Sequence, residues 1–392
     1  TRCDSDILRL RYPYPLLLGC LAPGDQSRGD VLSQQYDYSF QLYQEDNGRI
    51  RVEAHYLRGQ LDISDATTFR FQLLHDAISG SSPTGVLPGG VQPFTSNLED
   101  VREGILGALS HRFGDHKIDL ELSKSEENDY LSRGIAFSHE MEFNQKNTTL
   151  ALGASYLDDV VKVPGLGDRR KESLDIFTGV TQILSKNTVA SANLTLGFMN
   201  GYLNDPYKVV QRDELFSIAP DLSFPIVNIY RENRPDSRFR QVLLQEIKHY
   251  FESAQGTLDA TLRLSLDDFG IFAQTVHLEW RQEIGDTLLL IPFCRYYHQS
   301  AADFFVNTLN DLPITTPSSD PTGSGPNYSA DYRLSSFDAH SFGLRLRYQA
   351  SESFTLSAAY ERYLMNGTGG DSAPSGAYPD VNIFTIGARF KF

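Results

Sequence analysis

The stretch Asn-Ile-Phe-Thr-Ile-Gly-Ala-Arg-Phe-Lys-Phe, residues 382–392, decides the fold. One parity of this stretch is apolar and carries Phe384, Ile386, Ala388, Phe390 and Phe392. The other parity is largely polar and includes Arg389 and Lys391. Because successive side chains of a strand point to opposite faces, the pattern predicts a strand with one apolar and one polar face. A charged face of this kind can line a water-filled lumen, so the stretch indicates the closing strand of a transmembrane β-barrel.

The bulk composition agrees with a barrel and excludes a helical membrane protein. The chain has 392 residues, of which 40% are hydrophobic and 22% charged. No apolar run approaches the roughly 18–20 residues that a membrane-spanning helix needs. The net charge of −15 argues against nucleic acid as a partner.

Alternating strand patterns continue from Gln35 to the last residue, with no linker-like segment between them. They predict an all-β fold: a transmembrane antiparallel β-barrel of about 16 strands, with short periplasmic turns and long extracellular loops. The strand that ends at Phe392 is expected to pair with the strand near Gln35. With both termini in the periplasm, the long connections all fall outside: 79–99, 157–170, 203–237, 300–334 and 364–381.

The chain is predicted to have two parts, an N-terminal arm over residues 1–30 and an outer-membrane β-barrel over 31–392. The arm is expected to be periplasmic, luminal or partner-docking. Since the chain begins at Thr1, a signal peptide is expected to have been removed. A Cys3–Cys20 bridge within the arm is an open alternative. Cys294 falls within a strand and is expected to be a packing residue.

The inward parity of the predicted strands is charged with both signs. The predicted lumen-lining residues are Arg51, Glu53, Arg70, Asp119, Glu121, Glu140, Glu142, Asp259, Arg263, His277, Glu279, Arg281, Arg345, Arg347 and Arg389. One interpretation is a network of ion pairs that braces the wall. The other is a narrow polar pore whose mixed field filters solutes. On the same pattern, Leu278 and Trp280 should face lipid.

No cofactor is predicted from the sequence, because no recognised binding motif occurs in a suitable context. The outer loops are rich in Asp and Asn, including Asn204, Asp205 and Asp331. Such oxygen clusters could hold calcium, although solvated surface is the alternative that we favour. The hydroxyl, imidazole and carboxylate groups around His298, Asp338 and Ser341 leave an outer-membrane hydrolase as a weaker alternative. Because the hydrolase is only the weaker alternative, the chain is expected not to be an enzyme.

Five blocks of sequence resemble a known family. They are Ser125–Tyr130, Asn204–Tyr207, Glu232–Arg238 (Glu-Asn-Arg-Pro-Asp-Ser-Arg), Arg295–Phe305 (Arg-Tyr-Tyr-His-Gln-Ser-Ala-Ala-Asp-Phe-Phe) and Ser329–Ser335. Together they resemble an uncharacterised bacterial outer-membrane β-barrel family catalogued as a domain of unknown function. The likeness covers about residues 31–392. It implies an integral outer-membrane location in a Gram-negative envelope and a small lipoprotein or periplasmic partner, but no activity.

The two most specific blocks lie where long outer loops join strands. They suggest a loop-locking motif made of Arg234, Asp236, Arg238, Arg295 and Asp303, in which Arg–Asp pairs hold the loops over the mouth. Ligand capture by the same residues is the alternative.

The sequence thus favours a porin-like outer-membrane barrel with a function in transport. It would be a constricted channel for small polar solutes, surrounded by outer-membrane lipids. The alternative is a non-conducting barrel that anchors or assembles an envelope complex. Residues from 203–237 or 300–334 are expected to fold inward and pair with wall charges. The sequence does not indicate an oligomeric state.

Overall fold

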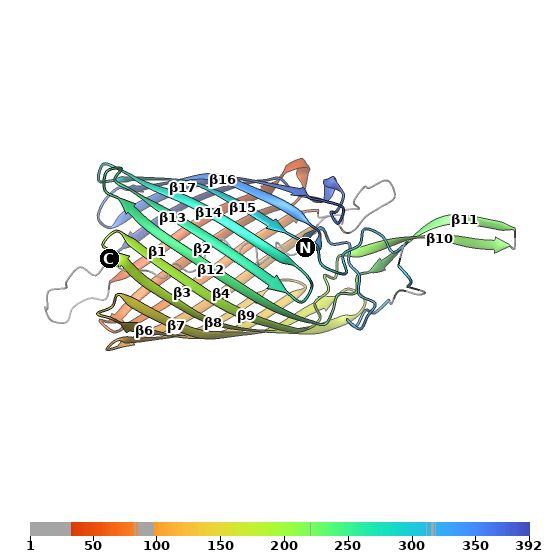
Figure 1. The fold of residues 1–392 in the computed structure, drawn as a ribbon, viewed down its shortest axis with the longest axis horizontal. Coiled ribbons are helices and arrows are strands. Elements are labelled where there is room, and N and C mark those ends of the chain that lie inside the picture. The colour runs from red at the N-terminus through yellow and green to blue at the C-terminus, as the bar shows by residue number, and fades with distance from the viewer. Residues whose placement is uncertain are drawn as a thin grey trace.

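The computed structural model describes residues 33–81, 84, 98–219, 221–310, 312–314, 317 and 319–392. Within these residues sixteen antiparallel strands form a closed barrel, and two more form a separate hairpin (Figure 1). In the described part of the chain no helix has the length and apolarity to cross a bilayer. The predicted all-β barrel of about 16 strands is confirmed. The N-terminal arm over residues 1–30 lies outside the described residues, and so does the suggested Cys3–Cys20 bridge.

The elements follow one another along the chain with short connections between most of them. The barrel strands are β1 Gln34–Glu45, β2 Arg51–Ser64, β3 Thr67–Gly80, β4 Leu98–Phe113, β5 His116–Glu126, β6 Tyr130–Phe143, β7 Thr148–Val163, β8 Gly167–Ser185, β9 Thr188–Gly201, β12 Ser237–Phe251, β13 Gly256–Asp267, β14 Phe272–Ile284, β15 Leu288–Gln299, β16 Phe337–Gln349, β17 Phe354–Gly367 and β18 Val381–Lys391. The hairpin consists of β10 Val209–Ala219 and β11 Leu222–Arg231. Three short 3₁₀ helices are η1 Asp46–Gly48, η2 Tyr332–Leu334 and η3 Ser375–Ala377.

The barrel closes between β1 and β18. Gln35 lies opposite Lys391, and the pairing runs on to Glu45 opposite Val381. The Gln34 amide donates to the Phe392 carbonyl at 3.0 Å, and the Phe392 amide donates back at 2.8 Å. The predicted pairing of the last strand with the first is therefore confirmed, and neither strand leaves an open edge.

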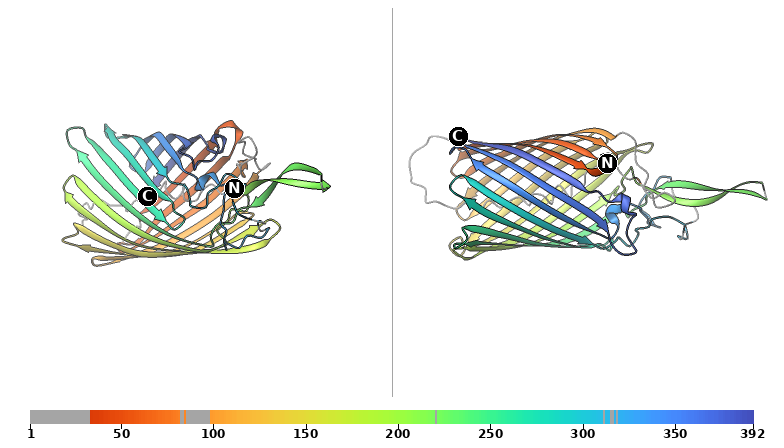
Figure 2. Two further views of the ribbon diagram at one scale, coloured as in Figure 1. Left: turned by 45° about the vertical axis from the view of Figure 1, so that its right-hand side comes forward. Right: turned by 90° about the horizontal axis from the view of Figure 1, so that it is seen from above.

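The two ends of the barrel differ in their connections. At the end that carries Phe392, here called the turn end, every connection between barrel strands has at most four residues. At the opposite end, the loop end, lie the connections 202–236, 300–336 and 368–380, and the β10–β11 hairpin projects from it along the barrel axis (Figures 1 and 2). The prediction that loops 203–237 and 300–334 share the side opposite Phe392 is confirmed.

Two of the expected loops contain regular structure. The predicted loop 157–170 is wrong, because β7 and β8 continue through it and are joined by residues 164–166 alone. Its inward residues Val161 and Val163 are buried against Tyr202 of the next connection, so burial extends the strands beyond the predicted ends. The predicted loop 203–237 contains two strands, β10 and β11, which form a separate two-stranded hairpin outside the barrel.

Cross-strand register assigns each side chain to one face of the wall. Phe384, Ile386 and Phe390 are 43–57% exposed, and the residues paired with them around the barrel are also mostly large and apolar. These residues form the outer, lipid-type surface. The opposite parity points into the lumen. Most of its buried apolar members lie at the loop end, where Val381 and Ile383 are 0% and 3% exposed, whereas Ile291 and Phe293 of β15 are buried deeper in the barrel.

Candidate functional site

The structure places thirteen of the predicted lumen-lining residues on the inward parity. These are Arg70, Asp119, Glu121, Glu140, Glu142, Asp259, Arg263, His277, Glu279, Arg281, Arg345, Arg347 and Arg389. Leu278 and Trp280 lie on the outer surface, as predicted. The charged face of the strands therefore lines a shared lumen.

The assignment of Arg51 and Glu53 to the lumen is wrong. Glu53 pairs in register with Leu42, which lies opposite Phe384 on the outer surface. Arg51 and Glu53 form an outward ion pair at 2.5 Å, with side chains 48% and 43% exposed. Their apolar neighbours Ile50 and Val52 point inward instead, where they pack against Ile78 and Tyr43. At the loop end the interior needs apolar side chains, which reverses the usual polarity of the two faces.

On β3 to β6 most luminal charges are paired with one another. Arg70 pairs with Asp119 at 2.5 Å, and Lys117 bridges Asp119 at 3.1 Å and Glu140 at 3.5 Å. Arg112 pairs with Glu142 at 2.6 Å. Acids and bases alternate across neighbouring strands, so this part of the wall satisfies its charges internally.

A second network joins β12 to β16. The carboxylate of Glu279 is only 5% exposed and accepts from Arg281 at 2.8 Å and from Arg345 at 2.9 Å. Asp259 lies 3.4 Å from Lys248 and 3.6 Å from Arg281. The Arg281 and Arg345 side chains nonetheless remain 42% and 41% exposed. Water therefore reaches the luminal charges in this half of the barrel.

The loop end is filled by a folded unit that we call the cap, made of the described residues of 202–208, 230–236, 300–336 and 371–380. Ala302 and Leu334 of the cap pack against the inward Ala273. Ala377 and Tyr378 pack against the inward Phe337 and Ala339. Because these contacts are made with the inner wall, the cap lies within the mouth of the barrel.

Buried charges hold the two largest connections of the cap together. Arg234 of the first connection pairs with Glu232 at 2.8 Å and with Asp331 of the second at 2.7 Å. Arg333 of the second connection pairs with Asp331 and reaches back to Asp205 of the first, both at 2.5 Å. Glu232 and Asp331 are each 1% exposed. We call Asp205, Lys208, Glu232, Arg234, Asp331 and Arg333 the cap cluster.

Burial and pairing act in opposite directions on the acids of the cap cluster. Burial alone would raise the pKa of Asp205, but the attraction of Arg333 and Lys208 outweighs it and holds that pKa well below its usual range. The pKa of Asp331 is likewise lowered, because Arg333, Lys208 and Arg234 outweigh its burial. Burial raises the pKa of Glu232, and Arg234 offsets this only in part. The cluster is therefore most stable when both aspartates are ionised.

The predicted loop-locking motif is only partly assembled. Arg234 does cross between the loops, but its partner is Asp331 rather than Asp236 or Asp303. Arg238 pairs with Asp267 of β13 and stacks over the Phe269 ring at 4.7 Å.

The other members of the motif have separate places. The Asp236 carbonyl accepts from the Gly201 amide at 2.7 Å, and the Asp303 amide donates to the Phe269 carbonyl at 2.8 Å. Arg295 lies on the inward face of β15, opposite His277. Asp331 and Asp205, expected to be solvated, are instead buried, as is Asn204. Nothing in the local sequence marks the two aspartates, because Asp331 lies 97 residues from Arg234 and Asp205 lies 128 residues from Arg333.

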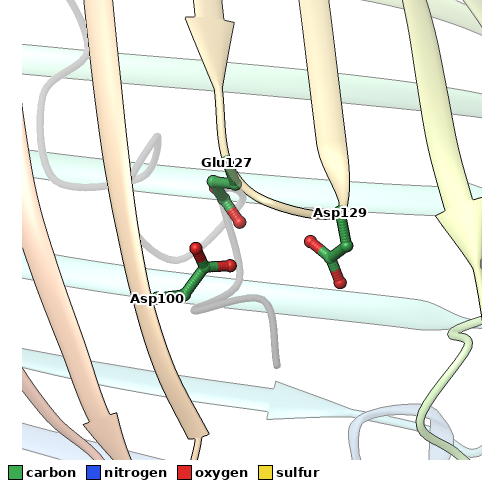
Figure 3. Close-up of side chains that lie close together, drawn as sticks. All are labelled: Asp100, Glu127 and Asp129. Atoms are coloured by element: carbon green, nitrogen blue, oxygen red, sulfur yellow. The ribbon is translucent and has the colours of Figure 1, made fainter.

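Three carboxylates from β4 and the β5–β6 turn converge at the loop end (Figure 3): Asp100, Glu127 and Asp129, whose ligand oxygens lie within 4.8 Å of one another. Burial raises the pKa of Glu127, although Arg102 lies 3.9 Å from it. The Tyr207 hydroxyl donates to Asp129. Oxygens in this arrangement suit a hard cation such as calcium. Calcium in the outer loops stays a prediction.

The residues considered for a hydrolase do not assemble into a nucleophile–base pair. His298 and Asp338 form a hydrogen bond of 2.5 Å on the outer surface. Ser341 points inward and is 1% exposed, on the face opposite His340. Cys294 is a free thiol on the outer face of β15.

The closed barrel, its exposed apolar belt and its charged lumen define a β-barrel fold of the outer-membrane type. The chain belongs to the family described as "Protein of unknown function (DUF3570)", whose model matches residues 23–170 and 164–390. The resemblance to a family catalogued as a domain of unknown function is thereby confirmed. No curated protein matches the chain.

Solved structures with a similar fold include a bacterial polysaccharide outer membrane secretin, with 10% identity, a TM-score of 0.49, and coverage of 92% of this chain and 98% of that one. CdiB from Acinetobacter baumannii has 8% identity, a TM-score of 0.49, and coverage of 92% and 60%. The outer membrane protein OmpT of Vibrio cholerae has 8% identity, a TM-score of 0.43, and coverage of 92% and 99%. These likenesses concern the fold.

Proposed function

We propose that this protein is an integral outer-membrane channel for small polar solutes, constricted by the cap at its loop end. The observation that carries the proposal is the contrast along the lumen. At the loop end the inward side chains are apolar and buried by the cap, with Val381 0% exposed. Deeper in the lumen the inward charges Arg281 and Arg345 remain about two-fifths exposed. A hydrated charged lumen under a folded cap is the arrangement of a constricted pore.

In this proposal the loop end faces the outside and the turn end faces the periplasm. Outer-membrane barrels place short turns on the periplasmic side and long loops outside. The strand connections of this chain have that asymmetry. Outer-membrane lipids then contact the belt of exposed apolar residues, and no enzymatic activity is proposed.

Conductance across a planar bilayer tests the channel. The wild-type protein should give small unitary steps, because the cap narrows the mouth. The double substitution Arg234→Ala and Asp331→Ala removes both partners of the contact that joins the two loops, and it should raise the step size. Lys186→Ala is a matched control, since its ion pair with Glu252 at 2.7 Å is exposed and lies at the turn end. A protein that folds but gives no steps, with or without the cap substitutions, would refute the channel.

A second candidate is a non-conducting barrel that anchors an envelope complex. The β10–β11 hairpin favours it, because this hairpin projects beyond the mouth (Figure 2). The hairpin also exposes apolar side chains on both of its faces. Leu215 and Ile218 are 74% and 65% exposed. Large apolar groups in water mark interaction surfaces. Site-specific crosslinking from Ser217 in intact envelopes would test for a neighbour, and a small lipoprotein or periplasmic partner stays a prediction.

A further inference from the structure

We propose that the lumen contains an oxyanion-binding site at the turn end, built from Arg347, Arg389 and the hydroxyls of Ser357 and Thr355. It would bind a carboxylate, phosphate or sulfate group. The inference rests on the proposed channel for its meaning as a solute site, but the site itself is argued from the wall alone.

Arg347 is a luminal cation for which the described residues supply no partner. Among the described residues it forms no hydrogen bond and no ion pair, and its side chain is exposed. The charges that act on it most strongly are those of Arg389, Arg281 and Arg345, with Asp37 contributing less. Holding like charges together costs Coulomb energy. In a protein with a net charge of −15, such a region suits an anionic ligand.

The neighbouring arginines already share their carboxylates. Glu279 forms ion pairs with both Arg281 and Arg345. Asp37 serves Arg389 at 2.5 Å. Glu283 is the remaining acid at this level, since it lies in the same cross-strand row as Arg347, two strands away on β14. With Asp259, which lies 3.6 Å from Arg281, four guanidinium groups face four carboxylates, and in the described part of the chain none of the four is paired with Arg347.

Register brings two hydroxyls between Arg347 and Arg389. Arg347 of β16 lies opposite Ser357 of β17, and Thr355 of β17 lies opposite Arg389 of β18. Neither hydroxyl forms a hydrogen bond with any of the residues that the structure describes. These three strands are adjacent in the wall and appear in blue in the right-hand view of Figure 2.

The spacing of these groups suits a small oxyanion. Arg347 and Arg389 are separated by one strand, which corresponds to about 10 Å between backbones. Their long side chains can therefore meet over β17. Gly387, opposite Ser357, carries no side chain that would fill the space, and the Ser357 hydroxyl lies 2.8 Å from where a Cβ would stand. Planar guanidinium forks and free hydroxyls are the donors that oxyanions prefer.

Titration of the purified, refolded full chain with inorganic phosphate at low ionic strength, followed by calorimetry, tests the site. Succinate serves as a second probe, and saturable binding of either supports the proposal. Arg347→Gln should weaken binding by about tenfold to hundredfold, the effect expected for losing a charged hydrogen-bond donor. Ser357→Ala should weaken it by about two- to tenfold. Since Arg347 has no partner among the described residues, Arg347→Gln should fold normally.

Arg51→Gln is the matched control, because it removes the same charge from the outer surface near the loop end. It should leave binding unchanged. If wild type binds neither probe saturably, or if Arg347→Gln and Arg51→Gln bind alike, the site does not exist. Conductance separates this inference from the proposed function: steps that do not respond to Arg347→Gln and phosphate would refute the site alone. Saturable, Arg347-dependent binding without any conductance would refute the channel alone.

Discussion

Replacing a lipid-facing residue at the middle of the barrel wall by arginine should destabilise the protein strongly, and β14 shows where the middle is. Its outward apolar band runs from Phe272 to Trp280, and one more outward apolar residue, Ile284, lies beyond Gln282, whose amide donates to the carbonyls of Ala254 and Gln255 in the turn. Eight residue steps of about 3.3 Å, in a strand tilted by about 40°, span about 20 Å along the barrel axis. Val276 lies at the centre of this band and is 41% exposed.

Val276→Arg should therefore cost about 2–4 kcal/mol of folding free energy, the range for arginine on the lipid face near the midplane. Trp280 lies about 10 Å nearer the turn end by the same arithmetic. There its ring covers Gly256 and lies 5.7 Å from that of Phe251, as in an aromatic girdle. The lipid-transfer cost of Trp280→Arg should accordingly be only about 0–1 kcal/mol, with the lost ring contacts in addition.

Reversible unfolding in urea, in detergent or lipid vesicles, measures these costs. Thr261→Arg is the matched control, because Thr261 lies opposite His277 on the inward face, at nearly the depth of Val276. Its cost should stay below about 1 kcal/mol, since arginine there meets water and acids. Equal costs for Val276→Arg and Thr261→Arg, or a larger cost for Thr261→Arg, would refute the assignment of inner and outer faces.

Three further results are expected. Arg333→Ala leaves Asp205 and Asp331 buried with fewer partners, so it should lower the free energy of opening of the cap by about 3–5 kcal/mol. Amide hydrogen exchange measures this: exchange should become faster in residues 202–208 but not in β12. The pKa values of Asp205 and Asp331 are lowered, so the stability they supply is fully present above their unfolded value of 3.8 and is lost progressively as the pH falls from there through their folded values. Protection of the cap against pepsin should therefore decrease steadily between about pH 4 and about pH 2, although protonation of Glu232, whose pKa is raised, opposes this. An epitope tag in the Ser185–Thr188 turn should be hidden from antibody on intact cells while one replacing Ser217–Ser223 is accessible, and the reverse pattern would invert the proposed orientation.

The period-two pattern determined the barrel. Phe384, Ile386 and Phe390 alternate with charged or small residues, and such a strand needs an apolar environment on one face and water on the other, which a membrane-spanning barrel supplies. The same alternation placed Glu279 and Arg281 in the lumen and Trp280 outside. These are local properties, because a residue's face depends only on its parity within its own strand. The asymmetry of loop lengths also follows from chain order alone, so the ends could be assigned from sequence.

The tertiary structure decided what fills the loop end. Arg51 and Glu53 have the luminal pattern but face outward, because the cap provides a second apolar interior that takes Ile50 and Val52. In the sequence Asp331 is an ordinary loop acid, yet in the structure it is buried between Arg234 and Arg333. Such pairing depends on where two connections about a hundred residues apart meet. The spacing of residues within one connection does not predict which residues of the other connection they will contact.

The same limit applies to the luminal charges. Sequence parity gives Arg345, Arg347 and Arg389 one common face, but it does not say which of them finds a carboxylate. Register decides this: Glu279 lies within reach of Arg345, and Asp37 lies opposite Arg389, while Arg347 lies opposite a serine. The sequence by itself therefore determined the wall and its two faces. Only closure of the barrel decided which charges are neutralised, because ion pairing depends on cross-strand neighbours that no single strand contains.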